Sequence, residues 1–466
     1  MILETMTSSG PVRGVALENS VVYRGIPYAR ARRFMAPEAA KPWKAVRICD
    51  HFGAIAMQEQ VKPGMPFSDF FIKEFYPHPM PMGEDCLFLN VWTPAALPGE
   101  KLPVMFWIHG GGLSTGYGHE MEFDGEAIAK RKVILVTINY RVGFFGCFAP
   151  REAVELNTTN KAGNNAVLDQ IAALLWVQNN IEAFGGNKEN VTVFGQSAGG
   201  GSVVSLLASP LARGLFCRAI IQSGLGGIST PQRQKTLEDG FEWADAFMKA
   251  SGKCYDELEQ MPADELLTLA SEITQKLPVM PQLVVDHYVF DEPPIERLLK
   301  GIEGISLMAG SVNGDGDLKM PGAVYHGPES ARAYFNELCI GVSQMQGAKD
   351  NPPYLYHFTA KIPGHDIYSF VADEVAFHSS ELWYVFGTLG RCWRPFDRRH
   401  YRLSDMMIDY WTNFAKKGNP NSAGLPEWPA FHKDHGSKML FLSETSIENK
   451  SPIDDEVWEG IAKVFE

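Results

Sequence analysis

The 466 residues include 45% hydrophobic and 21% charged residues, which is the composition of an ordinary globular protein with a sizeable core. The net charge of −13 argues against a nucleic-acid partner, because an acidic surface repels polyanions. No run approaches the roughly 18 apolar residues of a membrane helix, so we expect no membrane span.

The N-terminus and the cysteines bear on the cellular compartment of the protein and on whether it holds a zinc site or disulfides. The segment MILETMTSSGPVRG has no basic stretch followed by an apolar core, so either the protein is intracellular or a leader has been removed. Seven cysteines occur without CxxC spacing or paired cysteine and histidine spacing. This pattern argues against a zinc site and against a disulfide framework.

Strand-like runs dominate the first third of the chain. Residues 11–35 contain VVYRGIPYARA, which predicts an early antiparallel edge. Residues 55–85 hold five prolines and scattered aromatics, and we expect a long ordered loop with a functional role. The runs CLFLNVW (86–92), PVMFWIH (103–109) and VILVTIN (133–139) predict strands, the last of them buried on both faces as in a parallel sheet.

Three glycines follow the second of these strands directly. They leave backbone N–H groups unshielded, so the amides of Gly111 and Gly112 are candidates for an oxyanion hole, in which each donor contributes about 10²- to 10³-fold in rate. The alternative is a flexible turn without a chemical role.

The segment VTVFGQSAGG at 191–200 has the pattern of a nucleophile elbow. A short β-branched run precedes Ser197, and small and apolar residues at helical spacing follow it from Ala198 to Ala208. Gly195 and Gly199 suit a turn too tight for a Cβ on either flank, and the amide of Ala198 would be a further oxyanion donor. The alternative is a glycine-rich turn that only closes a βα unit.

The strands and helices alternate in this region, which is typical of an α/β sheet. AVLDQIAALLWVQNNI (166–181) predicts a helix, and RAIIQS (218–223) a further strand. From about 230 to 285 the sequence becomes charged and helical, as expected of an insertion over the catalytic edge. Strand patterns return at 305–310, 354–359 and 439–442, and a helix is expected over 404–416.

A serine nucleophile needs a histidine base and an orienting acid, in the chain order serine, acid, histidine for α/β-hydrolases. The histidines downstream of the elbow are not separated by residue patterns alone; they are His287, His326, His357, His365, His378, His400, His432 and His435. For the acid, Asp315 lies in GSVNGDGD (310–317) directly after a predicted strand, although the same segment also fits a plain turn.

The chain resembles the type-B carboxylesterase family, which includes para-nitrobenzyl esterases, carboxylesterases and cholinesterases. The motifs that carry this resemblance span nearly the whole chain; they are YRGIPYA, EDCLFLNVWTP, PVMFWIHGGG, VTINYRVGFFGCF, GNNAVLDQIAALLWVQNNIEAFGGN, VTVFGQSAGG, DYWTNFAKKGNPN and LPEWP. The resemblance implies an α/β-hydrolase fold that cleaves carboxylic esters without metal or cofactor.

The resemblance also assigns roles by motif. Ser197 matches the nucleophile, and Gly111, Gly112 and Ala198 match the oxyanion donors. The segment HSSELWYVFG (378–387) is similar to the family's HGxExxYVFG, which implies His378 as the base. Asp315 falls where the family mostly has glutamate, so either the backbone lies closer to the histidine or Asp317 is the acid.

Other departures bear on substrate and compartment. Gln196 stands where glutamate is common, and Tyr76 falls at the place of a cholinesterase tryptophan, so a choline ester is disfavoured. Secreted members of the family pair the cysteine that matches Cys86 with an upstream cysteine, and this chain has Met57-Gln58 at that place. Cys254 likewise has Met261 where a second cysteine is common. Both gaps favour a reducing cytoplasm.

These observations lead to one prediction of architecture and function. We expect a single α/β-hydrolase domain over residues 1–466, with a central mostly parallel sheet, helices on both faces, and a shortened helical cap inserted at about 230–300 and 317–350. We expect a monomeric or weakly homo-oligomeric serine esterase for small-molecule neutral esters, small or aromatic. A feruloyl-type esterase, an amidase and a non-catalytic cholinesterase-like binding protein are the alternatives.

Overall fold

A computed structural model describes most of the chain. The described residues are 1–64, 66–76, 78–157, 161–225, 235–277, 283–315, 338–339, 341–342, 351–364, 375–432 and 437–450. None of the helices in these ranges combines the length and apolar character needed to cross a bilayer.

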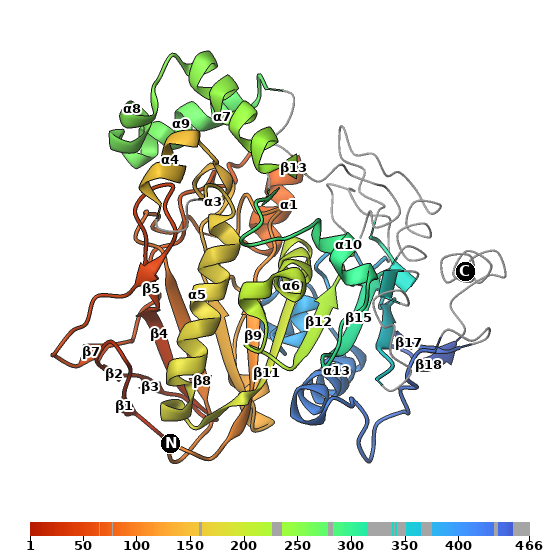
Figure 1. Ribbon diagram of the computed structural model, residues 1–466. Helices are drawn as coiled ribbons and strands as arrows, with labels where there is room; N and C mark the ends of the chain where they lie inside the picture. The colour runs from red at the N-terminus through yellow and green to blue at the C-terminus, as the bar shows by residue number, and fades with distance from the viewer. Residues whose placement is uncertain are drawn as a thin grey trace.

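Within the described ranges, the main sheet has 11 strands (Figure 1). Their order across the sheet is β18 (Ile447–Lys450), β17 (Met439–Leu442), β16 (Tyr354–Phe358), β15 (Ser306–Val312), β12 (Arg218–Gln222), β11 (Gly186–Gln196), β9 (Leu102–Ile108), β10 (Ile134–Ile138), β8 (Phe88–Thr93), β4 (Val21–Pro27) and β3 (Val15–Ala16). The strands from β10 to β17 in this order pair in parallel, and the outer strands on both sides pair antiparallel. The sheet is therefore mostly parallel.

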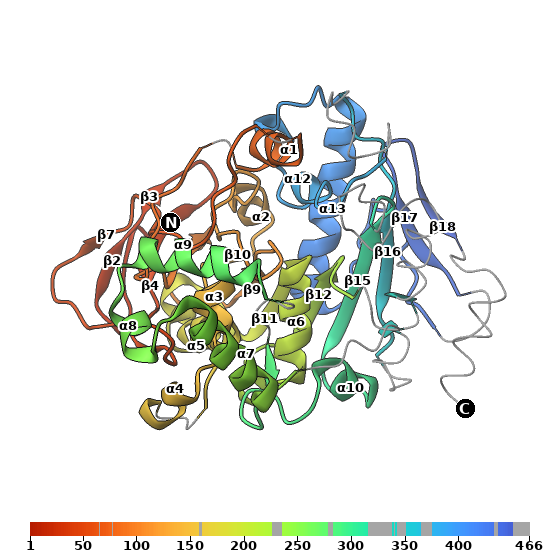
Figure 2. The ribbon, with the colours of Figure 1, turned by 90° about the horizontal axis from the view of Figure 1, so that it is seen from above.

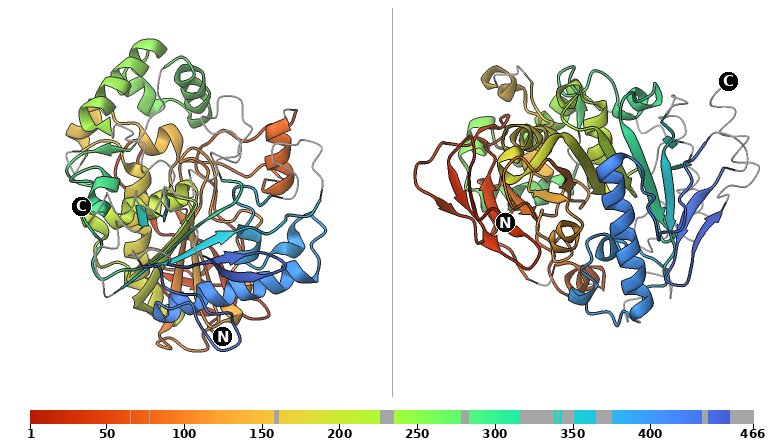
Figure 3. Two further views of the ribbon diagram at one scale, coloured as in Figure 1. Left: turned by 90° about the vertical axis from the view of Figure 1, so that its right-hand side faces the viewer. Right: turned by 90° about the horizontal axis from the view of Figure 1, so that it is seen from below.

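Helices cover both faces of this sheet. On one face, α5 (Asn165–Asn180) and α6 (Ala198–Ala208) pack against β11, and α10 (Pro294–Leu299) packs against α6. On the other face, α2 (Glu126–Lys130) packs against β8 and β10, and α13 (Arg398–Lys417) packs against β9 and β11. The two sets lie on opposite sides of the strands in Figure 2, and α13 is the blue helix in the right-hand view of Figure 3.

Because both faces are covered, the central strands carry apolar residues without alternation. All five residues of β10 are buried, as are the last five of β9. The remaining helices are short or peripheral; they are α1 (Pro66–Glu74), α3 (Gly143–Cys147), α4 (Arg151–Leu156), α7 (Leu237–Ser251), α8 (Tyr255–Gln260), α9 (Ala263–Thr274) and α12 (Leu382–Val385). Small sheets pair β1 (Glu4–Met6) with β2 (Pro11–Arg13) and β7 (Arg47–Ile48), β5 (Ala29–Arg30) with β6 (Glu38–Ala39), and β13 (Lys235–Thr236) with β14 (Val284–Val285).

Helices α7, α8 and α9 form in the region where the helical insertion is expected, and they stand above the body of the molecule (Figures 1 and 3). Their apolar faces pack on the region of α3, where Phe144 and Phe148 contact Phe247 and Trp243. Most of the second expected insertion, 317–350, lies outside the described residues. The division into one domain with a shortened cap therefore stays a prediction.

One expectation for the first third of the chain needs correction. Residues 55–85 are not loop throughout, because α1 forms within them; the prolines punctuate the stretch, and Pro66 begins the helix, where a missing N–H costs nothing. The run at 86–92 forms β8, which pairs antiparallel with β10 and with β4. The short helices α2, α3 and α4 carry too few turns to leave a clear periodicity in the sequence.

Candidate active site

The site is built around the turn between β11 and α6. Ser197 lies between the two elements with φ 56° and ψ −127°, a strained conformation for a residue with a side chain. A Cβ on Gly195 would lie 2.4 Å from the Gly199 carbonyl oxygen, and one on Gly199 would lie 2.1 Å from the Ile108 carbonyl oxygen. Both glycines are therefore required by close backbone approach, and the turn presents Ser197 partly exposed at the end of the sheet.

Strand register brings other loops to the same edge. Gly195 pairs with Ile108 of β9, while Gln196 pairs with Gln222 of β12 and Gln222 with Gly310 of β15. Because parallel strands end together, the segments after β9, β12 and β15 all emerge beside Ser197. This is the edge at which ligands bind in α/β sheets.

The glycine loop after β9 lies against the serine. A Cβ on Gly110 would approach the Gln196 carbonyl oxygen at 2.9 Å and Ser197 Cβ at 3.2 Å. Gly111 and Gly112 adopt positive φ values of 96° and 64°. Within the described part of the chain, the amides of Gly111, Gly112 and Ala198 donate to no protein acceptor. Three backbone donors are thus left for a ligand beside Ser197.

Asp315 and His378 meet at this edge. His378 Nδ1 lies 2.6 Å from Asp315 Oδ1, and the other carboxylate oxygen accepts hydrogen bonds from Ser223 Oγ at 2.6 Å and from the Val312 amide at 3.0 Å. The Asp315 side chain is only 2% exposed, whereas that of His378 is 27% exposed. The carboxylate is therefore fixed from the protein interior, and the imidazole is partly exposed.

The charges around the imidazole favour its protonated form. Burial works against the imidazolium, but the Asp315 carboxylate outweighs it through its charge and hydrogen bond, so the pKa of His378 is raised above its ordinary value. Glu381 lies fully buried nearby, and its burial together with the charge of Asp315 raises its pKa to about 7. Its Oε1 accepts a long hydrogen bond of 3.4 Å from Gln222 Nε2.

The side-chain amide of Gln196 lies against the imidazole. Its Nε2 lies 3.2 Å from His378 Nε2 and 3.5 Å from His378 Nδ1, off the direction of either lone pair, and its Oε1 accepts a hydrogen bond from Ser379 Oγ at 3.0 Å. Because the Asp315 carboxylate only accepts, its 2.6 Å contact places the proton of the neutral ring on Nδ1 and leaves Nε2 free to accept. Among the described residues no hydrogen bond joins Ser197 Oγ to His378.

Two of the other downstream histidines have hydrogen-bond partners of their own. His357 contacts Ser311 Oγ at 3.2 Å, and His400 contacts Tyr384 Oη at 2.7 Å, so both have partners away from Ser197. The alternative acid, Asp317, lies outside the described residues, as do His326, His365 and His435. Sequence reasoning did not single out Ser223 or Glu381, although Ser223 ends the strand pattern RAIIQS and Glu381 lies in the motif that contains His378.

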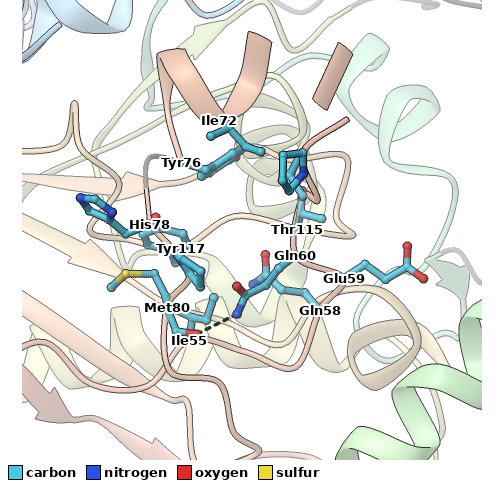
Figure 4. Close-up of a pocket in the computed structure, with 13 residues that line it drawn as sticks. Ile55, Gln58, Glu59, Gln60, Ile72, Tyr76, His78, Met80, Thr115 and Tyr117 are labelled. Atoms are coloured by element: carbon cyan, nitrogen blue, oxygen red, sulfur yellow. Dashed lines mark hydrogen bonds between the residues drawn. The ribbon is translucent and has the colours of Figure 1, made fainter. Parts of the chain in front are cut away.

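Two cavities border the glycine loop. One, of about 260 Å³, is lined by the 55–63 and 72–80 segments together with Thr115 and Tyr117 (Figure 4). The other, of about 270 Å³, lies between α3 and α9 and contains Phe144 and Leu267. Tyr76 and Tyr117 supply the aromatic part of the lining of the first cavity, together with Met80. The cap helix α9 thus forms a wall of the second.

Comparison with known proteins places this geometry in a family. The carboxylesterase family model matches residues 2–337 and 331–454. The chain belongs to the carboxylesterase family. The para-nitrobenzyl esterase of Bacillus subtilis (strain 168) is 32% identical over 95% of each chain. A solved structure of a thermophilic PNB esterase superposes with a TM-score of 0.82 at 30% identity and covers 100% of both chains.

A further solved structure, an esterase from anaerobic Clostridium hathewayi described as able to hydrolyse aliphatic aromatic polyesters, gives a TM-score of 0.80 at 25% identity over 99% of this chain and 98% of that one. These comparisons confirm the predicted α/β-hydrolase fold and the predicted family. This carboxylesterase is a carboxylic ester hydrolase.

Proposed function

We propose that the protein is a serine carboxylesterase that works through an acyl-enzyme, with Ser197 as nucleophile, His378 as base and Asp315 as the orienting acid. The observation that carries this proposal is the 2.6 Å contact of His378 with the buried Asp315 at the sheet edge where the strained turn presents Ser197. An acid, a base and a nucleophile at one edge are the components that acyl transfer requires.

The reaction follows from these positions. His378 Nε2 takes the proton of Ser197 Oγ as the oxygen attacks the ester carbonyl, and the carbonyl oxygen becomes an oxyanion that accepts from the amides of Gly111, Gly112 and Ala198. His378 then gives the proton to the leaving alkoxide, and the alcohol departs. Water repeats the cycle on the acyl-enzyme, releases the acid and restores Ser197.

Asp315 and Gln196 act on the base in different ways. Asp315 holds the proton on Nδ1, leaves the Nε2 lone pair free to accept, and stabilises the imidazolium that forms during attack. The Gln196 amide lies against the ring, 3.2 Å from Nε2 and 3.5 Å from Nδ1, and its hydrogen bond with Ser379 Oγ holds it there. Gln196 is neutral, and it therefore adds no negative charge beside the nucleophile.

We propose neutral esters with small or aromatic groups as substrates. The two cavities beside the glycine loop have mostly apolar and aromatic walls and sizes suited to a ring or a short chain. The relatives named for para-nitrobenzyl esters and aliphatic aromatic polyesters support aryl esters in particular. Feruloyl-type esters and amides share this chemistry and are the competing substrates.

A cytoplasmic location and a monomeric or weakly oligomeric state are further proposals. The free thiols of Cys86 and Cys254 support a reducing compartment. A non-catalytic binding role is disfavoured, because such a protein has no need of a serine held in a strained turn beside a buried acid and its histidine.

Replacing Ser197 by alanine tests the proposal. The variant should lose hydrolysis of short p-nitrophenyl esters and labelling by a fluorophosphonate, while its thermal unfolding stays close to that of the parent. Hydrolysis at the parent rate would refute the assignment. A panel of p-nitrophenyl esters of increasing acyl length, with feruloyl esters and anilides alongside, then ranks the substrate classes by kcat/KM.

A further inference from the structure

The glycine loop at 110–116 has an unusual backbone. Gly111, Gly112, Leu113 and Gly116 all adopt positive φ, with values of 96°, 64°, 57° and 100°. Such conformations are sparsely populated, for leucine above all, and they persist only where surrounding groups hold them. The groups that hold this loop therefore decide where its free amides point.

One peptide group of the loop is fixed from inside the loop. The Gly111 carbonyl oxygen accepts hydrogen bonds from the amides of Ser114 at 3.0 Å and Thr115 at 2.9 Å, and from Thr115 Oγ1 at 3.2 Å. The Gly111 carbonyl and the Gly112 amide belong to the same planar peptide and point in opposite directions. Holding that carbonyl on Thr115 therefore aims the Gly112 amide away from the loop interior.

Thr115 is held in turn through Gly116. The side chain of Gln58, from the 55–63 segment, binds both polar groups of Gly116: Gln58 Oε1 accepts from the Gly116 amide at 2.7 Å, and Gln58 Nε2 donates to the Gly116 carbonyl oxygen at 2.9 Å. Gln58 Nε2 also donates to the Ala56 carbonyl oxygen at 3.2 Å, which ties the side chain back to its own segment.

Gln58 is suited to this function by burial and by neutrality. It is 5% exposed, and its amide makes three hydrogen bonds that use both the donor and the acceptor. A carboxylate could accept from the Gly116 amide but would repel the two carbonyl oxygens, and an apolar side chain would bind neither. Glutamine is therefore matched to the site in length and in polarity.

We propose that Gln58 is a positioning residue for the oxyanion hole, acting through Gly116 and Thr115 on the Gly112 amide. This inference rests on the proposed function, in which that amide stabilises the oxyanion. Gln58 also lines both cavities, so its role in positioning the loop must be distinguished from a role in lining the cavities. A residue that only lines a cavity would act on substrate binding alone.

Gln60 offers a matched control. It lines the first cavity beside Gln58 (Figure 4), but its Nε2 donates to the Met80 carbonyl oxygen at 2.8 Å and it makes no described contact with the glycine loop. Gln58→Leu and Gln60→Leu change the polarity of the cavity wall in the same way. Only the first removes the clamp on Gly116.

Steady-state kinetics on a p-nitrophenyl ester should distinguish Gln58→Leu from Gln60→Leu. Complete loss of an oxyanion donor costs about 10²- to 10³-fold, so a loosened donor in Gln58→Leu should lower kcat by about tenfold or more, with KM within about threefold. A trifluoromethyl ketone, which forms a tetrahedral adduct with the serine, should lose affinity in parallel with kcat/KM. Gln58→Glu should resemble Gln58→Leu, whereas Gln60→Leu, which alters only the cavity wall, should change KM and keep the parent kcat.

Hydrogen–deuterium exchange gives a second readout that does not depend on activity. Peptides covering 109–117 should exchange faster in Gln58→Leu than in the parent and in Gln60→Leu. Equal exchange, or an effect on KM alone in a variant with unchanged thermal unfolding, would overturn the proposal. If the parent itself fails to hydrolyse esters, the proposed function fails, while the exchange comparison still decides whether Gln58 holds the loop.

Discussion

Asp315→Asn tests the proposed acid with the smallest possible change of shape. In the parent, Asp315 Oδ1 faces His378 Nδ1, and Oδ2 accepts from the Val312 amide and from Ser223 Oγ. An asparagine must turn its NH₂ group toward one side or the other. The Val312 amide cannot become an acceptor, so the NH₂ group will face His378 and donate to Nδ1.

That orientation reverses the tautomer of the base. With Nδ1 accepting, the proton of neutral His378 moves to Nε2, and no lone pair remains to take the proton of Ser197. The imidazolium also loses its negative partner in a site where Asp315 is 2% exposed. The corresponding change in a serine protease triad lowers kcat about 10⁴-fold, equivalent to about 5.5 kcal/mol of barrier, and we expect a loss of this order.

Initial rates of p-nitrophenyl acetate hydrolysis across pH provide the assay. Activity needs neutral His378, and its raised pKa places the acid limb of the parent profile above the ordinary histidine value of about 6.5; in Asp315→Asn the residual activity should extend to lower pH. Asp315→Glu, which keeps the carboxylate, should retain far more activity. Asp317→Asn should match the parent. Retention of more than about a tenth of the activity by Asp315→Asn, or an equal loss in Asp317→Asn, would refute the reasoning.

Three further changes follow from the site. Gln196→Glu places a carboxylate 3.2 Å from His378 Nε2, so the pKa of the histidine should rise further and the acid limb should move up by about one pH unit; an unmoved limb would contradict the contact. Glu381 has a pKa raised by burial to about 7, so it binds a proton in the folded chain that the unfolded chain releases near pH 4.5. As the pH rises from about 4.5 to about 7, the free energy of unfolding should therefore fall by about 3 kcal/mol through this group. The melting temperature of Glu381→Gln should decline less over that pH range than the melting temperature of the parent. Gly199→Ala puts a Cβ 2.1 Å from the Ile108 carbonyl oxygen, so the elbow must shift, and the melting temperature and the activity should both drop. A Gly199→Ala protein with the parent melting temperature would show that the turn accommodates a Cβ at this position.

Local patterns were sufficient for the central architecture. The apolar runs of β9, β10, β12 and β16 were located to within about two residues, because strands buried on both faces leave no polar interruption. The limits of α6, Ala198–Ala208, were predicted correctly, since the tight turn at Ser197 marks its start. The short helices α2, α3 and α4 and the helix α1 were missed because a few turns among glycines and prolines have no clear period.

Long-range pairing needed the folded chain. His378 could be distinguished from seven other histidines only by motif. No residue near it in the sequence indicates that Asp315, 63 residues away, is its partner. Register across β11, β12 and β15 brings Ser223 and Asp315 together beside Ser197, and no sequence spacing encodes that register.

Gln58 shows the same limit most clearly. Its neighbours in sequence give no sign that its amide binds Gly116, because the two are 58 residues apart and meet through loops rather than through regular pairing. The residue types of the site can thus be predicted from local sequence, because close backbone approach and burial restrict which residue fits at each position. The hydrogen-bond partners that set proton position and amide direction arise only when distant segments pack together.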